Sequence, residues 1–212
     1  MLSILEAAGW PIWPLLACSV LGLALALERF ISLRASRVAP PGVLEEALLV
    51  AARAGLPAPE VLRQFEDHSV LGAVLVSGWR ALQRHPGASE AELRSALESA
   101  GRLAAARLHQ NLTALGTIAS AAPLLGLLGT VIGMIEIFGS QSGTAGLTPG
   151  GGDPTQLAHG ISIALYNTAF GLLVAIPALV CWRHLRALAD AHLLQLEIAT
   201  ERFAQQLCAQ RR

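Results

Sequence analysis

Three long apolar segments dominate the pattern of hydrophobic and polar positions along this chain. They cover residues 10–30, 111–138 and 157–182. Each is long enough to cross a bilayer as a helix, which takes about 20 residues. The regions between them are more polar, or are broken by glycine and proline. The pattern therefore predicts an all-α membrane protein with three transmembrane helices and no sheet.

Shorter helical patterns fill the polar region of residues 31–110. Amphipathic helices are predicted over residues 43–53 and 59–65. The apolar segment 70–82 is too short to span a bilayer, so it is predicted to be either a buried or an interfacial helix.

A helix start is indicated at Ser89, because Glu92 follows three residues later in the pattern of a capping box. No proline occurs from Ser89 until Pro123, so we expect one helix to run from Ser89 into the second span. Residues 183–208 contain neither proline nor glycine and place apolar residues at helical spacing. The second and third spans are therefore predicted to extend into a cytoplasmic helical bundle.

The basic residues are unevenly distributed, and this asymmetry predicts a topology. All 15 are arginine, with none before Arg29 and none between Arg107 and Arg183. Hydrophobic residues make up 53% of the chain and charged residues 14%, which is too apolar for an ordinary soluble domain. The arginine-rich flanks of membrane spans are usually cytoplasmic.

The predicted topology has an outward N-terminus and an inward C-terminus. Residues 1–9 and the glycine-rich loop 139–156 face outward, whereas residues 31–110 and 183–212 face inward. Residues 1–9 contain Glu6 and no basic residue, unlike the start of a cleavable signal peptide. The first span is therefore expected to be retained in the membrane.

Few side chains offer chemistry of their own. Cys18, Cys181 and Cys208 lack the spacing of a metal site and are interpreted as packing or incidental thiols, so no metal or cofactor is expected. His159 is either an interfacial residue or a proton relay, and Glu136 either reaches the outer interface or carries protons. The sequence contains no nucleotide-binding loop and no nucleophile–base set, so it is not expected to be an enzyme.

The second and third spans each place one threonine on a face of small residues. These faces comprise Gly126, Thr130 and Gly133 on the second span, and Ala164, Thr168, Gly171 and Ala175 on the third. The two threonines are expected at a similar depth. Such faces either pack helices closely, each hydroxyl bonding a carbonyl one turn earlier, or line a cavity where the hydroxyls contact a proton-carrying group. Neither span has an acidic or basic residue near its centre, so a partner would supply that group.

The segments 123–135 and 160–177 together resemble the MotA/TolQ/ExbB proton channel family, and the resemblance covers about residues 95–185. The Glu28–Arg29 pair that closes the first span resembles the family as well. The length, the three spans and the outward N-terminus are similar to the ExbB/TolQ branch. Pro123 and Pro177 are assigned structural roles, as are Glu28 and Arg29.

This resemblance implies a homopentamer in the bacterial inner membrane, with no nucleic-acid partner. Its second and third helices would line a pore around the single-span helices of an ExbD- or TolR-like dimer. An aspartate of that partner would carry protons, and the family's two pore threonines match Thr130 and Thr168 here. The implied function is a proton-channel stator subunit that uses the proton motive force to energise a TonB-like transducer for outer-membrane import.

One position departs from the family pattern. ExbB and TolQ often have a glutamate five residues before the second threonine, where this chain has Ile163. Tyr166 and Asn167 also replace smaller residues common before that threonine. Two alternatives stay open: a TolQ-type stator of a Tol-Pal envelope-integrity system, and a non-conducting helical scaffold.

Overall fold

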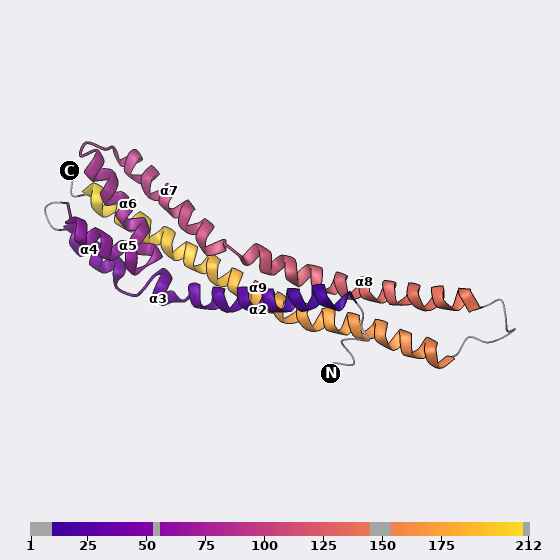
Figure 1. Ribbon diagram of the computed structural model, residues 1–212. Helices are drawn as coiled ribbons and strands as arrows, with labels where there is room; N and C mark the ends of the chain where they lie inside the picture. Colours follow the sequence, from indigo (N-terminus) through magenta and orange to yellow (C-terminus); the bar gives the residue numbers. More distant parts are fainter. Residues whose placement is uncertain (1–9, 53–55, 145–153, 210–212) are drawn as a thin grey trace. The chain divides into compact units, whose positions relative to one another are not determined.

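The computed structural model describes residues 10–52, 56–144 and 154–209, which form helices and short connections with no strand. The predicted outward N-terminus and residues 145–153 of the predicted outward loop lie outside the described residues, as do the side chains of His159 and Ile163. The helices, in chain order, are α2 (Ile12–Ser32), α3 (Ala35–Val38), α4 (Val43–Ala52), α5 (Pro59–His68), α6 (Val70–Arg84), α7 (Glu90–His109), α8 (Leu112–Thr144) and α9 (Pro154–Ala209) (Figure 1).

The predicted fold class is confirmed. Three helical segments are long and apolar enough to cross a membrane, and they lie in α2, α8 and α9. The chain divides into two compact units. We call them the span unit, Met1–Leu27 with Asn111–Arg183, and the bundle unit, Glu28–Gln110 with His184–Arg212. The long helix α9 contributes residues to both.

The span unit has a small apolar core where its three helices meet. Leu15, Ala122 and Ala175 are buried there, and larger side chains pack around them, namely Leu125, Phe170 and Val174. Many other large apolar side chains are exposed, including Val20, Leu124 and Leu173. Such a surface is stable in lipid, where apolar side chains need no protein cover.

The bundle unit is built around α6, which contacts α3, α4, α5 and α7. Its residue Trp79 is buried and packs edge to face against Phe203 of α9, with ring centroids 4.8 Å apart. The ring of Phe65 in α5 also packs against Trp79, with ring centroids 5.6 Å apart. The apolar segment 70–82 is therefore a buried helix and not an interfacial one.

The capping box predicted at Ser89 is confirmed. The Ser89 hydroxyl accepts a hydrogen bond from the Glu92 amide (3.2 Å), and the Glu92 carboxylate accepts one from the Ser89 amide (2.7 Å). The hydrogen bonds from the Ser89 backbone and side chain favour the charged carboxylate, so they lower the pKa of Glu92.

The prediction of a single helix from Ser89 into the second span is wrong in one respect, because the helix breaks between α7, which ends at His109, and α8, which begins at Leu112. Asn111 has a φ of 62°, in the left-handed region that asparagine enters more readily than most residues. The Gln110 amide bonds the Arg107 carbonyl at the end of α7 (3.3 Å), and the Leu115 amide bonds the Asn111 carbonyl at the start of α8 (3.1 Å). A search for proline and glycine alone misses this kind of break.

Candidate functional site

The small faces predicted on the second and third spans pack against each other in the span unit. A Cβ atom placed on Gly126 of α8 would lie 2.8 Å from the Asn167 carbonyl oxygen. One placed on Gly171 of α9 would lie 2.7 Å from the Ala122 carbonyl oxygen and 3.0 Å from the Gly126 Cα. Because these neighbours are backbone atoms, any side chain would force the helices apart. Glycine at these positions therefore permits backbone contact between α8 and α9.

The remaining small residues continue this contact in both directions. Ala164 and Ala175 are buried. A Cβ placed on Gly133 would lie 3.4 Å from the Ala164 Cβ, which is an ordinary contact distance. Within one chain, the two faces of small residues thus pack α8 and α9 together, as the first of the two alternatives predicts.

The two threonines on these faces, Thr130 and Thr168, form different hydrogen bonds. The Thr168 hydroxyl donates across the helix contact to the Gly126 carbonyl (3.3 Å). The Thr130 hydroxyl donates within α8 to the Leu127 carbonyl (2.7 Å). Gly126 and Thr130 are one helical turn apart, about 6 Å along the axis. The structure therefore places both hydroxyls within about a turn of one depth.

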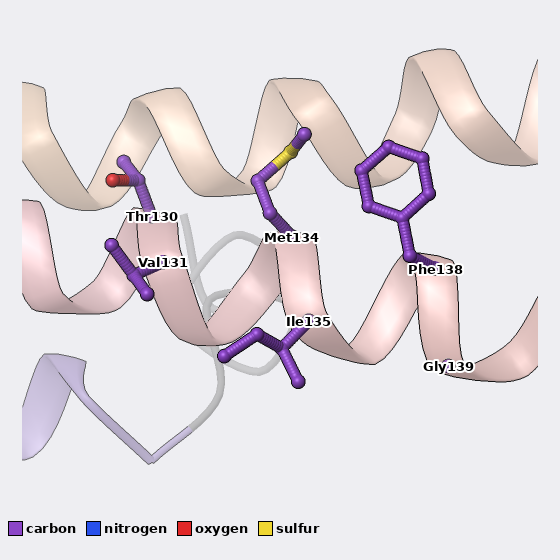
Figure 2. A pocket seen from close by; sticks show the side chains of 6 residues that line it. All are labelled: Thr130, Val131, Met134, Ile135, Phe138 and Gly139. Carbon is purple, nitrogen blue, oxygen red and sulfur yellow. The ribbon is translucent and has the colours of Figure 1, made fainter.

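Beside the helix contact, Thr130 opens onto a groove along α8. The groove has a volume of about 590 Å³ and is lined by Thr130, Val131, Met134, Ile135, Phe138 and Gly139. Figure 2 shows Thr130, Met134 and Phe138 in one row along the helix, with Val131 and Ile135 in a second row. Apart from the Thr130 hydroxyl, the side chains of this lining are apolar. Glu136 is exposed on α8 and is not part of the lining.

Sequence reasoning did not select Asn167, which the structure buries between α8 and α9. Its side chain is only 2% exposed and lies against Gly129, where an added Cβ would come within 2.8 Å of the Asn167 Cβ and 2.9 Å of its Nδ2. An amide in the middle of an apolar span was the available signal, since such residues are costly there.

The structural pair Glu28–Arg29 ties the end of α2 to the end of α7 in the bundle unit. Arg29 is 5% exposed, and its guanidinium donates to both carboxylate oxygens of Glu28 (2.8 and 2.9 Å). Its Nη1 donates to the Arg107 carbonyl in the last turn of α7 (3.1 Å). A cation is favourable at a helix C-terminus. Leu33 follows Arg29 by four residues, and its carbonyl is hydrogen-bonded to His192 Nε2 of α9 (3.0 Å), which joins α9 to the end of α2.

The other residues singled out in the sequence take no part in these contacts. Pro123 and Pro177 lie inside α8 and α9, which continue through them. Cys18, Cys181 and Cys208 are free, partly buried thiols. Within the described part of the chain, no group of three histidine, cysteine or acidic residues comes together in a way that could hold a metal ion.

The fold and this site define a multi-pass α-helical membrane protein in which two spans meet through glycine and each carries a mid-span hydroxyl. The sequence matches the profile of the MotA/TolQ/ExbB proton channel family over residues 66–198, and the chain belongs to this family.

Three relatives illustrate the similarity. Biopolymer transport protein exbB1 of Vibrio cholerae is 34% identical over 196 residues, 91% of this chain and 82% of that protein. A putative ExbB-like biopolymer transport protein of Synechocystis is 35% identical over 85% of this chain and 68% of its own length. The Tol-Pal system protein TolQ of Haemophilus influenzae is 35% identical over 53% of this chain and 48% of its own length.

These similarities place the chain in the ExbB/TolQ branch. It is a multi-pass protein of the inner membrane, and its family is one of proton-channel and transport subunits, not a known class of enzymes.

Proposed function

We propose that this chain is the proton-channel stator subunit of an ExbB–ExbD-type motor, which uses the proton motive force to energise a TonB-like transducer for outer-membrane import. The observation that carries the proposal is the Thr130 hydroxyl, which opens onto an apolar groove that runs along α8 from Thr130 to Gly139. Thr168 lies within about one turn of the same depth. The ExbB names of the relatives agree with this function.

In the proposed assembly, five copies surround a dimer of single-span ExbD- or TolR-like partners. One feature of the span unit supports an assembly, namely its uncovered groove along α8. The N-terminus is periplasmic and the C-terminus cytoplasmic in this proposal, which the distribution of arginine supports.

The hydrogen bonds of the threonines indicate how they would act on a partner carboxyl group. A hydroxyl has one proton to donate and two lone pairs that accept. Thr130 already donates to Leu127, and Thr168 to Gly126, so their oxygen lone pairs are the groups left to meet a partner. They would accept a hydrogen bond from a protonated aspartic acid and stabilise its neutral form in the membrane. The small residues of the two faces would hold together the helices that present the threonine hydroxyls; they are Gly126, Gly133, Ala164, Gly171 and Ala175.

The energy released by one proton and the energy of the two hydroxyl contacts are of similar size. A proton that crosses a potential of 100 mV releases about 2.3 kcal/mol. One hydroxyl contact in a membrane protein is worth about 1 kcal/mol, so two such contacts change the protonation of the partner without trapping the proton.

Two other functions are each favoured by one observation. Similarity to TolQ of H. influenzae favours a Tol-Pal stator, with the same proton chemistry and a different client. The hydrogen bonds of both threonines to backbone carbonyls within the span unit favour a non-conducting scaffold, in which these hydroxyls serve packing alone.

Valine substitutions separate conduction from packing. Thr130→Val and Thr168→Val nearly preserve side-chain shape, so the complex with the partner should assemble, while partner-dependent proton flux at matched protein level should fall. Thr117→Val is the matched control, because the Thr117 hydroxyl also bonds its own helix, at the Thr113 carbonyl (2.9 Å), but lies outside the two faces of small residues. Full flux in the double variant would assign the hydroxyls to packing. Native mass spectrometry of the same samples counts the copies, for which five are expected.

A further inference from the structure

We propose that Asn167 is a positioning residue of the proton pathway, seated in a notch that Gly129 leaves in α8. In this position it fixes the rotation of α9 against α8, and thereby the directions of the Thr130 and Thr168 hydroxyls. The inference rests on the proposed function and adds to it a residue that touches neither the groove nor the partner.

The notch is defined by close contacts of one side chain. A Cβ placed on Gly129 would lie 2.8 Å from the Asn167 Cβ, 2.9 Å from Nδ2 and 3.0 Å from Cγ. Three atoms of Asn167 therefore occupy the space that any residue other than glycine would need. With 2% of its surface exposed, the asparagine is enclosed on its other sides as well.

The two contacts between α8 and α9 that flank this notch are smooth by comparison. Gly126 meets Gly171 backbone to backbone, and Gly133 meets the Cβ of Ala164. Surfaces without protruding side chains set the distance between two helices but resist rotation weakly. Asn167 is the protruding side chain between these two contacts, so it acts as a key that selects one rotational setting.

The position of this key explains its effect on the hydroxyls. Gly129 immediately precedes Thr130 and Asn167 immediately precedes Thr168 in the chain. A rotation that removes Asn167 from the notch therefore turns Thr168 away from the Gly126 carbonyl, which it bonds at 3.3 Å. Misplacement of a group by about 1 Å can reduce a rate by about a hundred-fold, so a small rotation suffices.

An exchange of volume across the contact tests the inference. Asn167→Ala empties the notch and Gly129→Ala fills it, and each single variant should lower partner-dependent proton flux by about ten-fold or more at matched protein level. The double variant places the alanine Cβ of residue 129 in the space left by Asn167, so it should regain most of the flux. Gly116→Ala is the matched control, with a similar overlap against the Trp182 ring (2.8 Å) about 20 Å from the threonines.

A second measurement reads the orientation without proton flux. Thr130→Cys, in a chain whose native cysteines are replaced by alanine, is labelled with a small maleimide in the assembled complex. The labelling rate should change when Asn167→Ala is added and return towards the parent value when Gly129→Ala is added as well. The Gly116→Ala variant should label like its parent.

Each result bears on one proposal or the other. Parent-like flux in Asn167→Ala, an assembled double variant that does not recover, or equal losses in Gly129→Ala and Gly116→Ala would each overturn the positioning role. If the parent complex conducts no protons, the proposed function fails, and the labelling rates still decide whether Asn167 sets the orientation of Thr130.

Discussion

Replacing Gly171 by alanine tests how closely α8 and α9 pack. The added Cβ would lie 2.7 Å from the Ala122 carbonyl oxygen and 3.0 Å from the Gly126 Cα. To reach an ordinary contact of 3.4 Å, the helices must move apart by about 0.7 Å. A gap of 0.5–1 Å forfeits about a quarter to a half of the dispersion energy of the atoms that face it.

The expected loss of stability follows from three contributions. Overpacking of a close contact destabilises by about 1–3 kcal/mol. Separation of the helices also breaks the 3.3 Å bond from Thr168 to Gly126, worth about 1 kcal/mol in a membrane protein. Alanine offsets up to about 1 kcal/mol through its higher helix propensity. Gly171→Ala should therefore destabilise the span unit by about 2 kcal/mol, a factor of roughly thirty in the folded-to-unfolded ratio.

Gly133→Ala provides the matched control on the same face of α8. Its added Cβ would meet Ala164 at 3.4 Å, an ordinary contact, so stability should change by less than about 0.5 kcal/mol or increase slightly. Unfolding by SDS in mixed micelles, followed by tryptophan fluorescence, gives both free energies. Equal values for Gly171→Ala and Gly133→Ala would refute the backbone contact between α8 and α9.

Three further predictions concern the bundle unit. Trp79→Ala removes the buried ring that packs on Phe203 and should destabilise the protein by about 3–5 kcal/mol in thermal unfolding, whereas Trp79→Phe should lose clearly less. Gly101→Ala in α7 adds a Cβ that would have no neighbouring atom within 4 Å, so it should stabilise the protein by about 0.5–1 kcal/mol in the same assay. A loss of stability would contradict the absence of neighbours around this Cβ. Because hydrogen bonds from Ser89 lower the pKa of Glu92, its carboxylate stabilises the fold above the unfolded-state value near 4.5, and this contribution is lost as the pH falls through the lower folded-state value. Glu92→Gln should lack this acid-dependent part of the unfolding free energy, and an unchanged pH profile would exclude the capping box as its source.

Much of the fold could be predicted from local patterns. Apolar length identified the segments that can span a bilayer, and a serine followed by a glutamate at the third position located the start of α7. Both signals are carried by neighbouring residues, so no tertiary information is needed. The break at Asn111 could not be predicted in this way, because asparagine occupies right- and left-handed conformations and only the surrounding structure selects one.

The candidate site could likewise be predicted only in part from local patterns. The helical spacing of small residues identified the face of each span that carries a threonine, and the structure shows that these two faces pack against each other. The spacing could not show which hydroxyl bonds which carbonyl: Thr130 bonds its own helix, whereas Thr168 bonds the opposite one. The fit of Asn167 against Gly129 depends on the rotational setting of two helices, which periodicity does not specify.

The backbone contact between α8 and α9 limits how the proposed motor can move. Helices that touch through Gly126 and Gly171 cannot slide past each other without bringing Cβ atoms of adjacent residues against opposing carbonyls. In the proposed motor the pair would therefore act as one rigid element within each subunit. The groove beside Thr130 has the opposite character, since larger side chains line it and they can change rotamer as a partner passes. Movement driven by protons is thus expected between the groove and the partner helix, while the contact between α8 and α9 stays fixed.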